Sequence, residues 1–443
     1  MSYKVGMVSL GCPKNQVDAE RMLADLKSAG FELTANESEA DAVIVNTCGF
    51  IESAKTEAIE NIIEVAGYKQ SGSLKALIVT GCLAERYKDQ IKKEMPEVDC
   101  VLGIGANKKI VQAVSEALNG RESEIFPEKS ELSLCGQRIL TTPGYTAYLK
   151  IAEGCDNCCT YCAIPSIRGR FRSVPLEDCV REAEQLAKNG VKELVVVAQD
   201  TTNYGTDIYG KPMLAQLLDR LCEIDGIHWI RTLYTYPDKI TNELLQTIAR
   251  QKKLVNYLDI PIQHCNDRIL KRMNRSADKK MLIDLIKKIR TVIPNVTIRT
   301  TLITGFPGET EAEFTELCEF VKDMRFDRLG CFAYSEEEGT PAALFADQID
   351  KQVRTDRSEN IMNEQMTIAS QKNEEKTDSD LEVLVEGYDS YIKCYYGRGE
   401  SDAPDIDGKV FFTSNQKLLP GSFVKVHIND VIEYDLLGEH VEE

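Results

Sequence analysis

The chain has 443 residues, which is too long for one ordinary core, since a domain averages about 150 residues; two or three domains are therefore expected. Its hydrophobic content of 43% and charged content of 28% are those of a soluble globular protein. No apolar run approaches the about 18 residues that a membrane span needs, and the first residues lack the layout of a signal peptide. We therefore expect a cytoplasmic protein, whose 15 cysteines serve as metal ligands or core residues rather than as disulfides.

The net charge of −18 is unevenly distributed. Residues 378–443 hold 5 Lys and Arg against 15 Asp and Glu, a net charge of −10. Nucleic-acid-binding modules gain affinity from clustered Lys and Arg, so direct binding to nucleic acid is not expected. The acidic segment favours a basic protein partner, and a plain solubilising surface is the alternative interpretation.

Residues 1–122 are expected to form a parallel α/β domain, because apolar runs alternate there with helical patterns. The runs expected to be strands are Lys4–Leu10, Asp41–Val45 and Lys75–Val79. A cysteine follows each of them within a few residues, namely Cys12, Cys48 and Cys82. Because the carboxyl ends of parallel strands share one edge of a sheet, these three thiols are expected to converge.

A polar linker precedes the second domain, which is expected over residues 140–370, and one edge strand is expected in that linker at Cys135–Thr141. The second domain contains six strand-like runs separated by helical patterns. These runs are Thr146–Ile151, Glu193–Ala198, Ile227–Leu233, Val255–Ile260, Val296–Thr301 and Arg328–Phe332. Six such units predict an incomplete (β/α)6 barrel, whose functional residues gather in the loops after the strands.

In the last part of the chain, the spacing of the apolar residues changes from that of a helix to that of strands. A polar helix is expected over residues 346–376, and from Asp378 onward apolar residues alternate with polar ones between turns rich in Gly and Asp. This pattern predicts a small antiparallel β-barrel of about five strands in a third domain, residues 375–443.

The loop after the first barrel strand contains four cysteines in a segment of eight residues, and they allow two interpretations. Cys155, Cys159 and Cys162 give the spacing C-x3-C-x2-C, while inclusion of Cys158 gives two abutting C-x2-C pairs, as in a zinc site. Abutting pairs make a zinc tetrahedron difficult to close. Three thiolates on a [4Fe–4S] cluster leave one iron free to bind a substrate, and we favour this iron–sulfur interpretation.

The motifs around these cysteines resemble a known family. Glu153–Gly169 resembles the radical S-adenosylmethionine (SAM) methylthiotransferases, and Ser9–Glu20 resembles the cluster-binding N-terminal domain of that family. Tyr257–His264 and Tyr334–Pro341 are similar to the branch that modifies ribosomal protein uS12. The C-terminal barrel is similar to the TRAM domain. Together these motifs cover nearly the whole chain.

Some positions depart from the family pattern. Gln16 and Ala19 differ from the residues expected in the first motif, and neither is a thiolate. Cys158 stands where the family usually has another residue, and we interpret it as a bystander. The tRNA-modifying branch typically has a different sequence in place of Cys12-Pro-Lys-Asn15.

The resemblance implies two [4Fe–4S] clusters and two molecules of SAM. The first cluster would be held by Cys155, Cys159 and Cys162, and the second by Cys12, Cys48 and Cys82. A radical made from SAM would remove a hydrogen from the β-carbon of one uS12 aspartate, and the second cluster would bind the incoming sulfur. A low-potential electron donor and a sulfur donor are the further partners that this chemistry requires.

The turn after the fifth barrel strand is a candidate for SAM contact. By resemblance and position, Gly305, Pro307, Gly308 and Glu309 would help to hold SAM, and Tyr161 would pack against its adenine. The alternatives are a tight strand–helix turn with Glu309 in the first helical turn, where the helix dipole favours a carboxylate, and a core aromatic at Tyr161.

Two other functions stay open from the sequence. A tRNA adenosine methylthiotransferase would share the fold and the clusters, but the acidic segment argues against it. A non-catalytic iron–sulfur protein that binds the ribosome or carries electrons would normally use protein ligands for every iron. Binding of SAM would distinguish this carrier from an enzyme.

Overall fold

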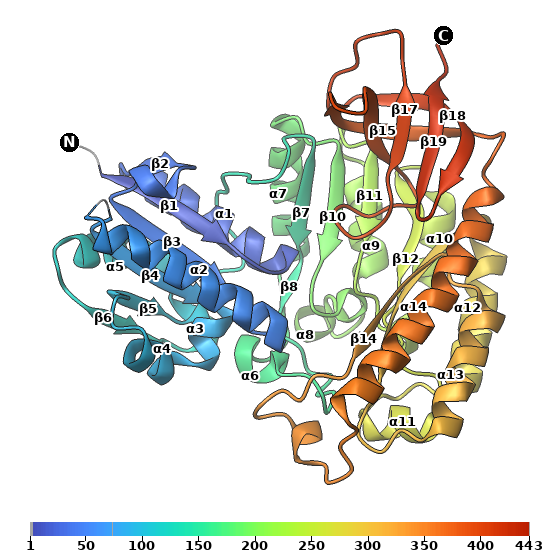
Figure 1. Ribbon diagram of the computed structural model, residues 1–443. Helices are drawn as coiled ribbons and strands as arrows, with labels where there is room; N and C mark the ends of the chain where they lie inside the picture. Colours follow the sequence, from blue (N-terminus) through green and yellow to red (C-terminus); the bar gives the residue numbers. More distant parts are fainter. Residues whose placement is uncertain (1–2, 73, 443) are drawn as a thin grey trace.

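The computed structural model describes residues 3–72 and 74–442, which form three parts arranged side by side and on top of one another (Figure 1). The N-terminal α/β part lies beside the central strands, and the C-terminal barrel lies above them in this view. Among the described residues, no helix is long and apolar enough to cross a membrane.

The N-terminal part is a six-stranded parallel sheet of order β2-β1-β3-β4-β5-β6. Its strands are β1 (Lys4–Ser9), β2 (Glu32–Thr34), β3 (Ala42–Thr47), β4 (Ala76–Gly81), β5 (Cys100–Leu102) and β6 (Ser123–Ile125). The three predicted strands are therefore confirmed as β1, β3 and β4. The short strands β2, β5 and β6 extend the sheet beyond what the sequence predicted.

Helices cover both faces of this sheet. They are α1 (Pro13–Ser28), α2 (Glu52–Gln70), α3 (Cys82–Arg86), α4 (Lys88–Glu94) and α5 (Ile110–Leu118). Side chains of α2 pack on one face, and side chains of α1 and α5 pack on the other. Strands β3 and β4 are consequently buried along their whole length, which explains their continuous apolar sequences.

The central part is an open sheet of six parallel strands in chain order. The strands are β7 (Thr146–Lys150), β10 (Glu193–Val197), β11 (Trp229–Thr232), β12 (Leu254–Asp259), β13 (Thr297–Thr304) and β14 (Arg328–Ala333). The helices that pack outside them are α7 (Leu176–Lys188), α9 (Leu214–Cys222), α10 (Asn242–Arg250), α12 (Lys279–Val292) and α13 (Glu311–Met324). The predicted incomplete barrel is confirmed.

The predicted edge strand at Cys135–Thr141 is wrong, since that segment has no strand structure. It is instead an extended connection tied down by its side chains. Arg138 pairs with Glu20 at 2.6 Å and with Glu182 at 2.6 Å, and the backbone N–H of Thr141 donates to Glu20. The connection thus bridges α1 and α7 and needs no strand partner.

The long helix α14 (Lys351–Glu374) leads into a closed five-stranded barrel of order β15-β16-β17-β19-β18. The strands are β15 (Asp380–Asp389), β16 (Cys394–Gly399), β17 (Val410–Thr413), β18 (Phe423–Ile432) and β19 (Asp435–His440). Neighbours are antiparallel except for β17 and β19, which pair in parallel. The small barrel expected from the alternating sequence is therefore present.

Both flanking parts pack onto the inner face of the central sheet. Val17 of α1 and Ala403 of the loop between β16 and β17 belong to one buried apolar cluster with Tyr148, Val197 and Tyr257 of the central strands. The gap that an incomplete barrel leaves is thus closed from two sides, by α1 and by the C-terminal barrel.

Candidate functional site

The three N-terminal cysteines lie at the carboxyl ends of adjacent strands. Cys12 is the N-cap of α1 after β1, Cys48 follows β3, and Cys82 begins α3 directly after β4. Gly11, with φ of +89°, allows a close approach, since a Cβ there would lie 2.7 Å from the Cβ of Cys48. The three cysteines therefore follow adjacent strands at the same edge of the sheet, and we call them the N-terminal triad.

Positive charge surrounds this N-terminal triad. The Arg168 guanidinium lies 3.4 Å from the Cys82 sulfur. Burial raises the pKa of Cys82 to about 12, although Arg168 opposes this shift. For Cys12 burial acts in the same direction, but the charges of Lys14 and Arg168 and the backbone N–H of Asn15 outweigh it and lower the pKa. The pocket therefore favours anionic sulfur at Cys12, and a bound iron would deprotonate the others.

The second group of cysteines, the central triad, lies in the loop between β8 (Ala152–Glu153) and α6 (Ile164–Arg168). Its members Cys155, Cys159 and Cys162 are half-buried or buried. Burial raises the pKa of Cys155 to about 11 and that of Cys162 to about 12. The Cys155 and Cys162 thiols would therefore lose their protons only when a metal supplies the opposite charge.

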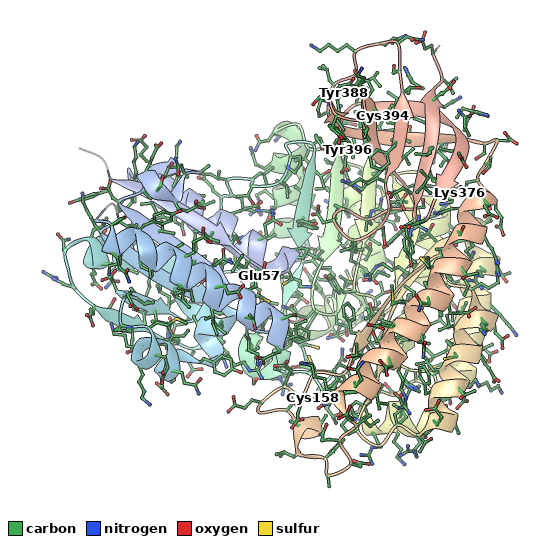
Figure 2. The ribbon with its side chains drawn as sticks, viewed as in Figure 1. Glu57, Cys158, Lys376, Tyr388, Cys394 and Tyr396 are labelled. Carbon is green, nitrogen blue, oxygen red and sulfur yellow. The ribbon has the colours of Figure 1, made fainter. Side chains whose placement is uncertain are left out.

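Cys158 differs from its neighbours in this loop. Its side chain is exposed, its φ is +50°, and its carbonyl accepts a hydrogen bond from the Asn274 side chain at 2.9 Å. Figure 2 labels it below the central strands, on the same side as α6 in Figure 1.

A buried network of charges joins the two triads. Arg168 of α6 pairs with Asp18 of α1 at 2.7 Å and with Glu153 of β8 at 3.1 Å. Lys150 pairs with the same two carboxylates, at 2.9 Å for Glu153, and Gln199 also donates to Glu153 at 2.8 Å. Burial alone would raise the pKa of Glu153, but Arg168 and Lys150 hold it well below its usual range. Two cations and two anions thus balance in the space between the triads.

The turn after β13 is compact and held by α14. Gly305 and Gly308 have φ of +68° and +77°, and a Cβ on either would collide with Arg354 or Asp347. Glu309 is buried; it accepts the Gly305 N–H at 3.0 Å and pairs with Arg357 at 2.8 Å. The interpretation that placed Glu309 in the first helical turn is wrong, because α13 begins at Glu311 after the cap residue Thr310.

Tyr161 lies next to the central triad. Its hydroxyl is 3.4 Å from Arg275, whose guanidinium lies 3.9 Å from the Cys159 sulfur and 4.2 Å from the ring centre of Tyr236. Its ring packs at the edge of a buried cluster that includes Phe306. Burial raises the pKa of Tyr161 well above its ordinary value, so the phenol stays protonated.

Sequence reasoning missed the charged side chains of the site. Arg275 stands in no recognisable motif, and Lys14 and Arg168 lie inside the motifs Ser9–Glu20 and Glu153–Gly169, where no role was predicted for them. The signal that could have found the latter two was their position, two residues after Cys12 and six after Cys162.

Each triad offers a donor set that suits an iron–sulfur cluster, namely three thiols with an arginine beside them. Within residues 3–72 and 74–442, no three His, Cys, Asp or Glu side chains lie close enough to hold one metal ion. A [4Fe–4S] cluster binds each thiolate through a different iron, so its ligands are spread more widely. Three thiols and positive neighbours are what an anionic cluster with one open iron requires.

Three family models match successive parts of the chain. They are the Uncharacterized protein family UPF0004 at residues 4–103, the Radical SAM superfamily at residues 149–321 and the TRAM domain at residues 379–441. The structure of the radical SAM methyltransferase TsrM from Kitasatospora setae, with tryptophan and a SAM analog bound, has a TM-score of 0.56. At 13% identity, covering 77% of this chain and 75% of that one, it supports the fold alone. Fold and site together define a radical SAM protein.

Curated relatives extend over the whole chain. The "Ribosomal protein uS12 methylthiotransferase RimO" of Thermoanaerobacter sp. (strain X514) is 51% identical over 98% of this chain and 99% of its own length. The protein of the same name from Pelotomaculum thermopropionicum is 51% identical over 100% of both chains. The chain therefore belongs to the family of the ribosomal protein uS12 methylthiotransferases.

Proposed function

We propose that this protein attaches a methylthio group to the β-carbon of an aspartate in ribosomal protein uS12. The observation that carries the proposal is the presence of two separate cysteine triads, one in the N-terminal domain and one in the central domain, in a chain 51% identical to relatives with that name. One triad alone would suffice for a radical reaction, whereas transfer of sulfur needs a second site. The tRNA alternative lacks comparable support, because the acidic C-terminal segment opposes binding to phosphates.

The cysteines would hold the cofactors as two sets. The central triad of Cys155, Cys159 and Cys162 would bind one [4Fe–4S] cluster, and the N-terminal triad of Cys12, Cys48 and Cys82 would bind the second. When bound, the clusters and SAM would supply the radical and the methylthio group.

The turn that contains Gly305, Pro307 and Gly308 would hold SAM with its backbone. Glu309 would act by fixing that turn through Gly305 and Arg357, and Tyr161 would lie against the adenine.

The protein's own contribution is position and exclusion of water. The C–H bond at the β-carbon has no useful acidity, so no general base is required. What is required is a fixed distance between the two triads, and the buried network of Arg168, Lys150, Asp18 and Glu153 supports such rigidity. Water is kept out by α1 and the C-terminal barrel, which cover the inner face of the central sheet.

Further parts of the proposal concern organisation and partners. We assign residues 1–122 to the domain of the second cluster, 140–370 to the radical SAM core and 375–443 to the TRAM domain. The protein would act in the cytoplasm, where its ribosomal substrate is made, and would need a low-potential electron donor and a sulfur donor.

The test is mass spectrometry of uS12 and bulk tRNA after anaerobic incubation with cluster-reconstituted protein, SAM, sulfide and a strong reductant. A methylthio mass gain on one uS12 aspartate is expected, and a gain on tRNA alone would overturn the proposal. The matched variants are Cys48→Ala and Cys159→Ala. The first should still release 5′-deoxyadenosine but yield no methylthio product, and the second should do neither. Methylthio product from Cys48→Ala would refute the second cluster.

A further inference from the structure

The buried cations of the molecule fall into two groups. Nine Lys and Arg residues are buried, namely Lys14, Arg21, Lys150, Arg168, Arg231, Arg275, Arg328, Arg357 and Arg398. Seven of them form ion pairs with carboxylates. Of the nine buried cations found among residues 3–72 and 74–442, only Lys14 and Arg275 have no carboxylate partner. The acidic groups beside these two cations are thiols and phenols, Cys12 and Tyr234 for Lys14, and Cys159, Tyr161 and Tyr236 for Arg275. Neither cation has a carboxylate to balance its charge, so each site can take a further anion.

The exceptions lie beside the two triads. Arg275 contacts Cys159, whereas Lys14 is the second residue of α1, two positions after Cys12. The Lys14 side chain does not fold back onto its own domain. It crosses to the central part, where its ammonium lies 3.4 Å from the ring centre of Tyr234, in the loop that follows β11. Lys14 therefore stands where the N-terminal triad meets the mouth of the central sheet.

The backbone of Tyr234 adopts an unfavourable conformation, and the Tyr234 ring lies against the Lys14 ammonium. The φ of Tyr234 is +61°, which is uncommon for a bulky residue. Asp259 accepts the Tyr234 N–H at 3.0 Å, and Thr201 donates both its N–H and its hydroxyl to the Tyr234 carbonyl, each at 3.0 Å. Such conformations persist where neighbours fix them, and they concentrate at ligand sites.

Either of two anions could balance the positive charge of Lys14: a cluster bound to the N-terminal triad, or an incoming ligand. The triad already has its own cation in contact, because Arg168 lies 3.4 Å from the Cys82 sulfur. Burial would lower the pKa of Lys14, and Cys12 helps to raise it. In the described part of the chain, however, no hydrogen bond joins the Lys14 ammonium to a sulfur, and the ammonium faces the Tyr234 ring of the opposite domain. Its direction favours a ligand that enters between the two domains.

We propose that Lys14 binds the side-chain carboxylate of the substrate aspartate and thereby holds the β-carbon between the two triads. The inference rests on the proposed function and names the group that would select its substrate. The carboxylate is unchanged by reaction at the β-carbon, so this ion pair can persist from binding to product. A nucleobase has no carboxylate, and it would leave the Lys14 charge unpaired.

The test is a double-mutant cycle on binding, measured by calorimetry between the protein and uS12 under anaerobic conditions, with and without reconstituted clusters. The protein variants are Lys14→Met, Lys14→Arg and the control Lys27→Met, which changes an exposed lysine of the same helix. The uS12 variant replaces the modified aspartate by asparagine. Lys14→Met should weaken binding of uS12 about tenfold or more, as expected for a buried charged hydrogen bond, while Lys14→Arg and Lys27→Met should bind nearly as well as the unchanged protein.

The cycle separates recognition of the carboxylate from other roles. The asparagine form of uS12 should bind the unchanged protein about as weakly as Lys14→Met binds uS12, with no further loss when both changes are combined. Equal loss on both forms of uS12, or no loss on either, would overturn the inference. Iron content and the cluster spectrum of Lys14→Met should match those of the unchanged protein, and a changed spectrum with intact binding would likewise overturn it. If the unchanged protein binds uS12 through Lys14 but adds no methylthio group, the proposed function fails while the recognition stands.

Discussion

The central domain makes two buried, charged interfaces, and they lie at opposite ends of its strands. Towards the N-terminal domain, Lys150 at the end of β7 and Arg168 of α6 pair with Asp18 of α1. Towards the C-terminal barrel, Glu193 at the start of β10 pairs with Arg398 of β16 at 2.6 Å. The carboxyl ends of the strands therefore carry the interface with the cysteines, and the amino ends carry one without them.

The same kind of interaction serves two purposes at these interfaces. A buried ion pair adds little stability compared with apolar packing, but removal of one partner leaves an unpaired charge and is strongly destabilising. At the amino ends of the central strands, the cost of an unpaired charge fixes how the C-terminal barrel docks. At the carboxyl ends it also fixes the distance between two reactive sites, so that interface is the one in which a small displacement should abolish chemistry.

The largest effect is expected from Arg168→Met. The change leaves Asp18 and Glu153 with Lys150 alone, and a stability loss of about 3–5 kcal/mol is expected. Because both triads are displaced relative to each other, the rate of methylthio product formation should fall about a hundredfold or more. Urea unfolding and quantitative mass spectrometry of uS12 measure the two losses. Full activity in a destabilised Arg168→Met protein would show that this interface does not set the distance between the triads.

The matched change at the other interface is Arg398→Met. It leaves Glu193 with Arg231 alone and Glu386 without Arg398, so a similar loss of about 3–5 kcal/mol is expected in the docking of the C-terminal barrel. Limited proteolysis between α14 and β15 should become faster. Formation of 5′-deoxyadenosine should stay within about twofold of the unchanged protein, since no cysteine loop moves; a loss as large as that of Arg168→Met would show that the two interfaces are not distinct.

Acid should weaken the amino-end interface selectively. Burial raises the pKa of Glu193, but Arg398 and Arg231 outweigh it and lower the pKa from 4.5 to about 2. Because its pKa is lower in the folded protein than in the unfolded chain, ionised Glu193 stabilises the fold at pH values above about 4.5. This contribution, on the order of 3 kcal/mol, is lost as the pH falls from about 4.5 towards 2. Proteolysis at the barrel junction should therefore accelerate below pH 4.5. The variant Glu193→Gln should be cleaved quickly at pH 6 and respond less to acid, and an unchanged acid response in that variant would assign the effect to other groups.

The sequence predicted the strands of both parallel sheets where an apolar run was long. Strands β1, β3 and β4 each have six residues and a continuous apolar core, whereas β2, β5 and β6 have three residues each and no periodic signal. The false edge strand at residues 135–141 has another cause. Its extended backbone is stabilised by Arg138, whose partners are 118 and 44 residues away, and a local pattern does not contain such contacts.

The same limit applies to the site. The cysteines were found because their spacing and their position at strand ends are local properties. Lys14 and Arg275 were not, because a lysine or arginine is normally exposed and only the packed structure shows that these two are buried without a carboxylate. The part of the site that selects a substrate is therefore the part that the sequence did not reveal.

The smallest effect is expected from Cys158→Ser, which tests whether proximity to the central triad is sufficient for a role. The side chain is exposed, and its only described hydrogen bonds run through the backbone carbonyl, so serine preserves every contact and the same strained φ of +50°. Product formation and iron content should stay within about twofold, whereas Cys159→Ser, one position away, should lose both. Loss of iron from Cys158→Ser would instead make Cys158 a ligand. The carboxyl-end interface would then depend on exposed groups as well as on those that face inward, and its contrast with the amino-end interface would need a different explanation.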